Sequence, residues 1–153
     1  MRIKNRYFWM AALTALLFDQ LTKYWVVHTF ALSQTLPIIN GIFHFTYVTN
    51  TGAAFSLLSG KVELLRWLSL GVSLVLITVA LSGPLLSFWD QLGYGLILGG
   101  AMGNGVDRFR LGYVIDFLDF RLINFAIFNM ADSFISMGIV CLLIASWQKT
   151  PSN

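Results

Sequence analysis

The sequence contains little charge. Only 11% of its 153 residues are charged and 57% are hydrophobic, whereas a typical soluble domain is about 25% charged. The mean hydropathy of +0.73 points the same way. We therefore expect residues 1–153 to form a single integral membrane domain. At roughly 20 residues per helical span, the length allows about four spans with their connections and leaves no room for a second domain.

Rare residue types exclude several kinds of chemistry. The single cysteine, Cys141, allows no intrachain disulfide and lies in an apolar stretch where a catalytic thiolate would be costly. The two histidines, His28 and His44, fit no H-E-x-x-H or comparable spacing, so we expect no metal and no cofactor. No G-x-S-x-G motif or serine–lysine constellation occurs. The basic residues are scattered, so the net charge of +3 does not indicate a nucleic-acid partner.

The long apolar segments define the expected architecture. Four of them can cross a membrane as helices: residues 7–27, 64–81, 86–102 and 131–147. The first is too long for the apolar region of a cleaved signal peptide, so we expect it to be retained. "SGPLL", residues 82–86, separates the second from the third. In the third, Gly95, Gly99 and Gly103 place bare backbone on one face, which favours close contact with a neighbouring helix.

The basic residues at the N-terminus predict the orientation. Arg2, Lys4 and Arg6 precede the first apolar segment, which places this end in the cytoplasm under the positive-inside rule. Four spans return the C-terminus to the cytoplasm, and the two longer connections then face outward. These outward connections nevertheless contain four basic residues that need another explanation: Lys61, Arg108, Arg110 and Arg121.

The outward connections have the pattern of strands. Residues 41–50, "GIFHFTYVTN", alternate aromatic residues with smaller or polar ones, which is the period of a β-strand. Residues 114–128 are also rich in β-forming types. We expect a small sheet on the outer face, with His44 on its surface. The predicted fold class is an all-α membrane protein of four transmembrane helices with a small outer β-sheet.

Polar residues in and beside the apolar segments are the first candidates for function. Asp19 and Lys23 lie at i and i+4, so they share a helix face. Charge inside a membrane is costly and usually functional, and the pair is either a self-contained ion pair or the support of a site. Three further residues follow the third segment and serve either to cap and solvate a helix end or to build a site: Asn104, Asp107 and Arg108.

Three aspartates stand close together in "VIDFLDFRLINFAIFNMADS", residues 114–133. In a strand, Asp116 and Asp119 point to opposite faces. Asp119 would share a face with Arg121 as a solvated partner, whereas Asp116 would share one with apolar residues, which raises a carboxyl pKa. Asp132 begins the fourth apolar segment. It either complements a helix N-terminus or forms half of a carboxylate pair in which one group holds a proton and the other activates water.

Five ordered blocks carry a resemblance to a known family. "DQLTK", "NTGAAF", "GGAMGNGVDR", "GYVIDF" and "FNMADS" span residues 19–133. In this order and at these places relative to four spans, the chain resembles the bacterial lipoprotein signal peptidases (signal peptidase II), which are four-span intramembrane aspartic proteases. The family often has proline where this chain has Ala126, a departure that leaves both aspartates of the motifs in place.

The resemblance implies a role for each matching residue. Asp116 and Asp132 would be the catalytic pair, and Asp119 lies outside the motifs. Supporting or substrate-binding roles would belong to seven others: Asp19, Lys23, Asn50, Asn104, Asp107, Arg108 and Asn129.

The implied reaction is removal of the signal peptide from a diacylglyceryl-modified prolipoprotein, just before the lipidated cysteine. It would take place near the outer face of the bacterial cytoplasmic membrane and be inhibited by globomycin. Two alternatives are a small transporter or channel that uses Asp19 and Lys23, and a lipid-binding protein without catalysis. Against the transporter, the polar residues gather at one membrane face and no inverted repeat is visible.

Overall fold

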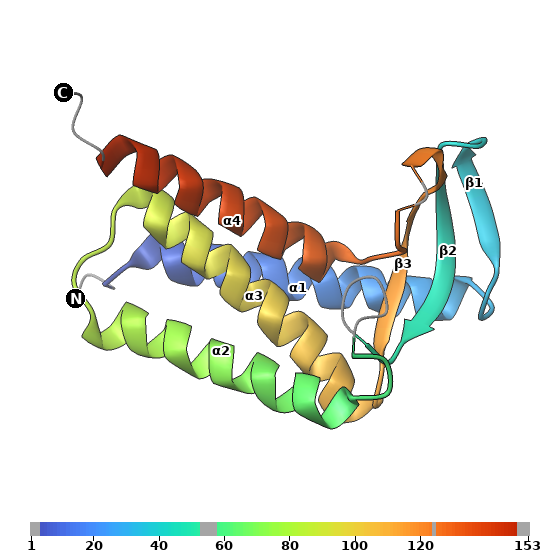
Figure 1. Cartoon of the computed structure of the whole chain (residues 1–153), viewed down its shortest axis with the longest axis horizontal. Coiled ribbons are helices and arrows are strands. Elements are labelled where there is room, and N and C mark those ends of the chain that lie inside the picture. The colour runs from blue at the N-terminus through green and yellow to red at the C-terminus, as the bar shows by residue number, and fades with distance from the viewer. Residues whose placement is uncertain (1–3, 53–57, 124, 150–153) are drawn as a thin grey trace.

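The computed structural model describes residues 4–52, 58–123 and 125–149. Four long helices form a bundle: α1 (Arg6–Thr29), α2 (Val62–Ser82), α3 (Phe88–Arg110) and α4 (Met130–Lys149). α3 contacts each of the other three and runs through the middle of the bundle (Figure 1). The helical architecture predicted from the sequence is confirmed. By length and composition, α2 and α4 are apolar enough to cross a membrane.

The third helix is longer than predicted. The apolar pattern ended at residue 102, but α3 continues to Arg110. Hydropathy falls there because residues 103–110 include polar side chains, yet most of these are buried against neighbouring elements. A helix that satisfies its polar groups inside the protein can continue past the end of its apolar segment.

Glycines allow α3 to approach two helices closely. A Cβ atom on Gly99 would lie 2.6 Å from the Cβ of Ala15 in α1. One on Gly100, on the next position of the helix, would lie 2.7 Å from Cγ1 of Ile135 in α4. The predicted close contact of a glycine face with a neighbouring helix is therefore confirmed, and that helix is α1. A second glycine face of α3 packs closely against α4.

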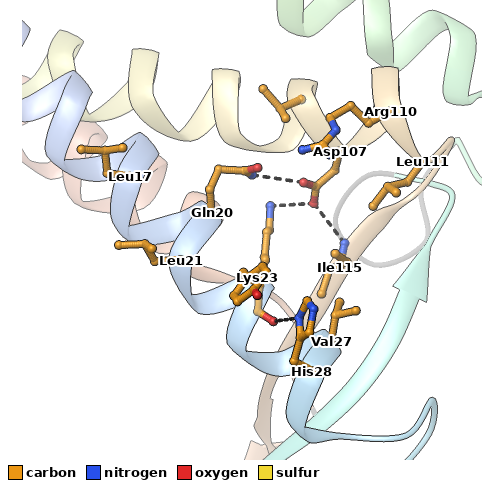
Figure 2. Close-up of a pocket in the computed structure, with 12 residues that line it drawn as sticks. Leu17, Gln20, Leu21, Lys23, Val27, His28, Asp107, Arg110, Leu111 and Ile115 are labelled. Carbon is orange, nitrogen blue, oxygen red and sulfur yellow. Dashed lines mark hydrogen bonds and ion pairs between the residues drawn. The ribbon is translucent and has the colours of Figure 1, made fainter.

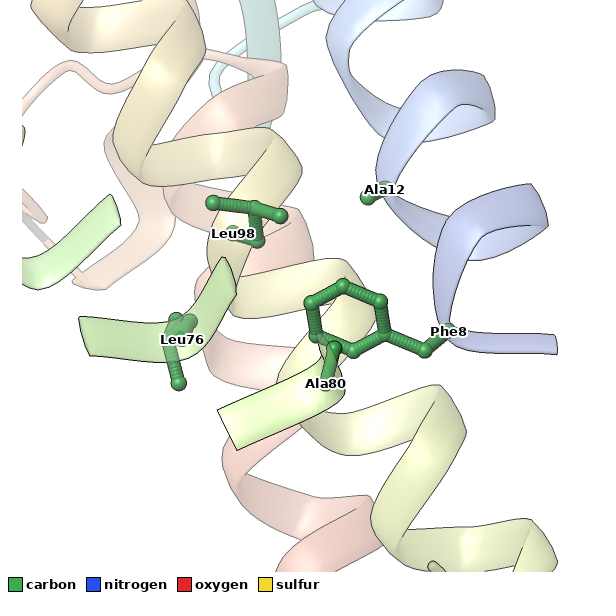
Figure 3. Close-up of a cluster of buried hydrophobic side chains, with 5 residues drawn as sticks. All are labelled: Phe8, Ala12, Leu76, Ala80 and Leu98. Atoms are coloured by element: carbon green, nitrogen blue, oxygen red, sulfur yellow. The ribbon is translucent and has the colours of Figure 1, made fainter. Parts of the chain in front are cut away.

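A small apolar core fills the half of the bundle that lies away from the sheet. Figure 3 shows its five buried members, which come from α1, α2 and α3: Phe8, Ala12, Leu76, Ala80 and Leu98. Because these side chains lie far from the polar residues near the sheet, they stabilise the bundle without shaping the candidate site.

Three strands form an antiparallel sheet in the order β1 (Thr35–Ile39), β2 (Phe43–Asn50) and β3 (Val114–Phe120). A short 3-10 helix, η2 (Arg121–Ile123), follows β3. Figure 1 shows the sheet at one end of the bundle, across the ends of α1 and α3, with the first turn of α1 and the last turn of α4 at the other end. The predicted strand within residues 41–50 is confirmed. Of residues 114–128, only Val114–Phe120 form a strand, and β1 was not predicted.

The sheet is fixed to the bundle by a second apolar cluster. Val26 and Phe30, at the end of α1, contact Tyr47 of β2 and both Ile115 and Phe117 of β3. These contacts fix the position of β3 relative to the helices. They therefore also fix the position of Asp116, which lies between Ile115 and Phe117.

One prediction about this sheet is wrong. His44 lies on β2 but is buried, with 6% of its surface exposed, rather than on the outside of the sheet. It lies opposite Asp119 of β3 in the register of the sheet, and Asp119 is also buried.

Candidate active site

A cavity of about 670 Å³ opens where β3 meets the ends of α2, α3 and α4. Its lining includes Asp116 and Asp132, together with Asn50, Asn104 and Arg108. A volume of this size is usual for a ligand-binding cleft. The cavity therefore brings together the two aspartates that the motifs pair and three of the predicted supporting residues.

Asp116 occupies the middle of β3 and is almost fully buried. Its two carboxylate oxygens accept hydrogen bonds from amide nitrogens, one from Asn50 at 2.9 Å and one from Asn129 at 2.7 Å. Burial raises the pKa of Asp116 from 3.8 to about 7, and the nearby charge of Asp132 adds to the rise, against the opposing hydrogen bonds. The predicted desolvation of this carboxylate is confirmed.

Asp132 has two roles in the structure. It lies in the first turn of α4 and exchanges hydrogen bonds with Asn129, whose side chain accepts from the Asp132 backbone N–H at 3.1 Å. The carboxylate of Asp132 in turn accepts from the Asn129 N–H at 3.2 Å, which is the reciprocal arrangement of a capping box. Its other oxygen accepts from Nδ2 of Asn104 at 2.8 Å. The helix cap, one of the two alternatives from the sequence, is present, and the same side chain also lines the cavity.

Asn129 joins the two aspartates. Its side chain donates to Asp116 and its backbone N–H donates to Asp132. The same Nδ2 also lies 3.0 Å from Oδ1 of Asn104. Because Asn129 has no exposed surface, its position fixes both carboxylates relative to each other.

A second carboxylate pair lies behind the first. Lys23 makes ion pairs of 2.9 Å with Asp19 and with Asp107, and it donates to Oδ1 of Asn104 at 3.0 Å. Asp19 also accepts from the backbone N–H of Ala131, at the start of α4. The predicted pair of Asp19 and Lys23 is thus part of a larger buried network, which fixes the amide that contacts Asp132.

Gln20 is the member of this network that sequence reasoning missed. Its amide nitrogen lies 3.1 Å from a carboxylate oxygen of Asp19, 3.1 Å from one of Asp107 and 3.2 Å from the carbonyl oxygen of Gly103. Figure 2 shows Gln20 and Lys23 reaching from α1 to Asp107 on α3. Its place beside Asp19 in "DQLTK" was the available signal.

Arg108 is buried at the cavity wall and not solvated at a helix end. Its guanidinium donates to the carbonyl oxygen of Gly52 at 3.1 Å, and it interacts electrostatically with both Asp132 and Asp116. Asn104 and Asp107 are also buried, so helix-end solvation is wrong for all three. All nine predicted residues lie in one connected network.

Asp119 belongs to a different environment. Its carboxylate accepts from Thr46 at 2.7 Å and forms a 2.9 Å ion pair with Arg121. Burial opposes ionisation, but these hydrogen bonds and the arginine charge outweigh it and lower the pKa of Asp119. The predicted pairing with Arg121 is confirmed, whereas the predicted solvation is wrong because Asp119 is buried.

Among the residues that the structure describes, no group of three or more histidine, cysteine, aspartate or glutamate side chains could hold a metal ion. At the cavity, two carboxylates are held by amide groups. One of them has a pKa near neutrality, which suits proton transfer.

Comparison with known proteins identifies the family. The sequence pattern of the family described as "Signal peptidase (SPase) II" matches residues 11–148. The chain belongs to the signal peptidase II family. It is 79% identical to a protein of Nostoc sp. (strain PCC 7120) and 77% identical to one of Nostoc punctiforme, both called lipoprotein signal peptidase. In each case the match covers 100% of this chain and 97% of the relative.

Solved structures of two bacterial membrane enzymes have the same fold. One, determined at 2.3 Å, has a TM-score of 0.84 and 29% identity, with 94% of this chain and 92% of that chain covered. The other, at 1.9 Å, has a TM-score of 0.81 and 30% identity, with 92% of each chain covered. Membership of the signal peptidase II family, together with these structures, makes the chain a membrane peptidase and does not favour the transporter alternative.

Proposed function

We propose that this member of the signal peptidase II family is an aspartic endopeptidase whose catalytic groups are Asp116 and Asp132. The observation that carries the proposal is the shared attachment of two carboxylates to Asn129 inside one cavity. The raised pKa of Asp116 supports it. Two carboxylates this close favour a state in which one holds a proton and the other is charged.

The reaction needs one ionised carboxylate and one protonated carboxyl group. The ionised carboxylate removes a proton from a water molecule as its oxygen attacks the scissile carbonyl carbon. The protonated carboxyl donates its proton to the carbonyl oxygen, and a tetrahedral intermediate forms. The carboxyl that received the water proton then donates it to the leaving nitrogen, and the other carboxylate takes back a hydroxyl proton of the intermediate. The C–N bond breaks, which leaves a carboxylic acid and a free amine. Asn50, Asn104 and Asn129 hold the carboxylates in place for these transfers.

Two openings at Asp116 suit the substrate. The 670 Å³ cavity has an apolar side formed by α2 and α3, including Leu65, Leu68 and Val72, which suits the signal-peptide helix and the diacylglyceryl chains of a prolipoprotein. A second cavity of about 330 Å³ reaches Asp116 from the sheet and is lined by Thr49 and Thr51. It offers water and the polar part of the substrate a separate approach.

The proposed placement has all four helices crossing the bacterial cytoplasmic membrane, with residues 1–153 as one domain. Three basic residues support a cytoplasmic position for the end opposite the sheet: Lys4, Arg6 and Lys149. The sheet and the two cavities would then lie near the outer face. Among the basic residues predicted to face outward, Arg108 and Arg121 have partners within the protein.

Cleavage of a defined precursor tests this function. Purified enzyme is incubated with a diacylglyceryl-modified prolipoprotein, and the products are identified by mass spectrometry. We expect a signal peptide that ends just before the lipidated cysteine, no product from D132N, and wild-type rates from D90N. Asp90 is a matched control because it pairs with Lys149 at the other end of the bundle. Wild-type cleavage by D132N would exclude the mechanism.

Globomycin separates catalysis from simple lipid binding. We expect it to inhibit cleavage by occupying the cavity beside the two aspartates. Tight globomycin binding by a folded preparation that never releases signal peptide would instead favour a lipid-binding protein without catalysis.

A further inference from the structure

Arg110 and Lys61 are the two outward basic residues that the proposed mechanism leaves without a role, and of the two it is Arg110 that borders depressions on the surface of the bundle. It ends α3, is exposed, and makes no hydrogen bond or ion pair with any described residue. It also lies outside the 670 Å³ cavity, and instead borders two other depressions on the surface of the bundle.

The first depression is a groove of about 420 Å³ between α1 and α3, drawn in Figure 2. Near the sheet, Arg110 lies on one wall and His28 on the other, together with the apolar side chains of Val27, Leu111 and Ile115. Away from the sheet its wall is Leu21 and Leu17 of α1. At 1.5 Å per residue, the distance along α1 from Leu17 to His28 is about 16 Å, close to the thickness of one bilayer leaflet.

The second depression is a groove of about 310 Å³ between α2 and α3. It also begins at Arg110 and extends away from the sheet, along Leu74 and Ile77 of α2. Val106, one turn before Arg110, borders both grooves. Two apolar grooves therefore diverge from a single unpaired guanidinium on the ridge of α3.

We propose that this surface binds one anionic diacyl phospholipid of the outer leaflet, with its phosphate at Arg110 and one acyl chain in each groove. The polarity of each groove matches that of such a lipid, because the cation lies at the level of the sheet and the leucines lie deeper. Guanidinium groups pair well with phosphate oxygens. The inference rests on the membrane placement proposed above, but it concerns a site other than the catalytic cavity.

Lys23 and Asp107 form the floor of the first groove. Since Lys23 also donates to Asn104, a lipid seated there lies directly behind the network that positions Asp132. The lipid site and the catalytic site thus share a wall.

Native mass spectrometry of the full chain in detergent tests the site with dioleoyl phosphatidylglycerol and dioleoyl phosphatidylcholine. We expect the wild type to bind the anionic lipid about five-fold more tightly, as one basic residue at a membrane surface contributes. R110Q should abolish this preference, whereas K61Q, which removes an exposed outward charge elsewhere, should keep it. L21W and L74W, which fill one groove each, should weaken binding of both lipids.

Three results would overturn the proposal. One is an unchanged lipid preference in R110Q, even if that variant melts at a lower temperature. Another is equally tight binding of single-chain lysophosphatidylglycerol, which needs only one groove. The last is displacement of the lipid by inorganic phosphate at equal concentration. Precursor cleavage by R110Q in detergent, expected at the wild-type rate, shows that the variant is folded and separates this inference from the catalytic one.

Discussion

Two pairs of aspartates lie back to back in this protein and differ in their partners. Asp19 and Asp107 share the ammonium group of Lys23 through two ion pairs. Asp116 and Asp132 form no ion pair with a described residue, and amide groups hold them instead. Both pairs lie at the same end of the bundle. Asp19, Asp107 and Asp116 are buried, whereas Asp132 is partly exposed, so burial alone does not distinguish Asp116 from the other pair.

The partners decide what each pair can do. Lys23 gives Asp19 and Asp107 a shared counter-charge, so that pair stabilises the fold. Burial raises the pKa of Asp116 to about 7, although the hydrogen bonds from its amide partners oppose the rise. Asn104 connects the two pairs, because it accepts from Lys23 and donates to Asp132. Asp19 and Asp107, the rear pair, therefore position Asp116 and Asp132, the front pair.

Removing a carboxylate from the front pair should have the largest effect. We expect D116N to reduce kcat by about 10³-fold, because an amide can neither hold nor accept the transferred proton. The near-isosteric change should keep the fold. The measurement is precursor cleavage, with the melting temperature as the control for folding. A D116N enzyme that retains a tenth of wild-type activity would contradict the assignment.

Removing the cation from the rear pair should cost both stability and rate. K23M leaves two buried carboxylates without a counter-charge, which costs about 3–5 kcal/mol and lowers the melting temperature by roughly 10 °C. Asn104 also loses a donor, and a displaced Asp132 should reduce kcat by about 10²-fold.

The exposed Lys61 supplies the control for this change. K61M should affect neither the melting temperature nor kcat. If K23M and K61M behave alike, Lys23 is not what links the two pairs.

The pH profile should depend on the front pair. Because the pKa of Asp116 is about 7, this carboxyl is protonated below that pH and loses its proton above it. The rate of cleavage should therefore fall as the pH rises through about 7, when the pair has no acid left.

The variant N50A should shift this fall in rate. Asn50 donates a hydrogen bond that lowers the pKa of Asp116, so without it the fall in rate should occur at higher pH. N40A, at an exposed turn residue, should leave the profile unchanged. If the cleavage rate of N50A falls at the same pH as that of the wild type, or at a lower one, this account is contradicted.

The sequence predicted the helices, much of the sheet and the different environments of Asp116 and Asp119. It did not predict which side chains contact one another across these elements. Strand alternation separated Asp116 from Asp119, since side-chain direction in a strand follows from position alone. The family motifs added Asp132. Neither could show that Asn129 bonds to both Asp116 and Asp132, because that depends on where α4 docks against β3.

The end of α3 and the role of Gln20 were missed for a related reason. A helix that buries polar side chains against a partner has no one-dimensional hydropathy signal. Gln20 has three acceptors that come from two different helices, and only the folded chain brings them together.

Replacing Asp119 should have the smallest effect on activity and stability. D119N weakens the contact with Arg121, which is partly exposed, and we expect a loss of about 1 kcal/mol with kcat within roughly two-fold of wild type. The pKa of Asp119 is lowered in the folded protein, so its stabilising effect is present at neutral pH and is lost as the pH falls below the ordinary value of 3.8. The difference in melting temperature between wild type and D119N should therefore be measurable at pH 7 and shrink below that value. A loss of activity as large as that of D116N would mean that the two faces of β3 do not separate catalysis from structure.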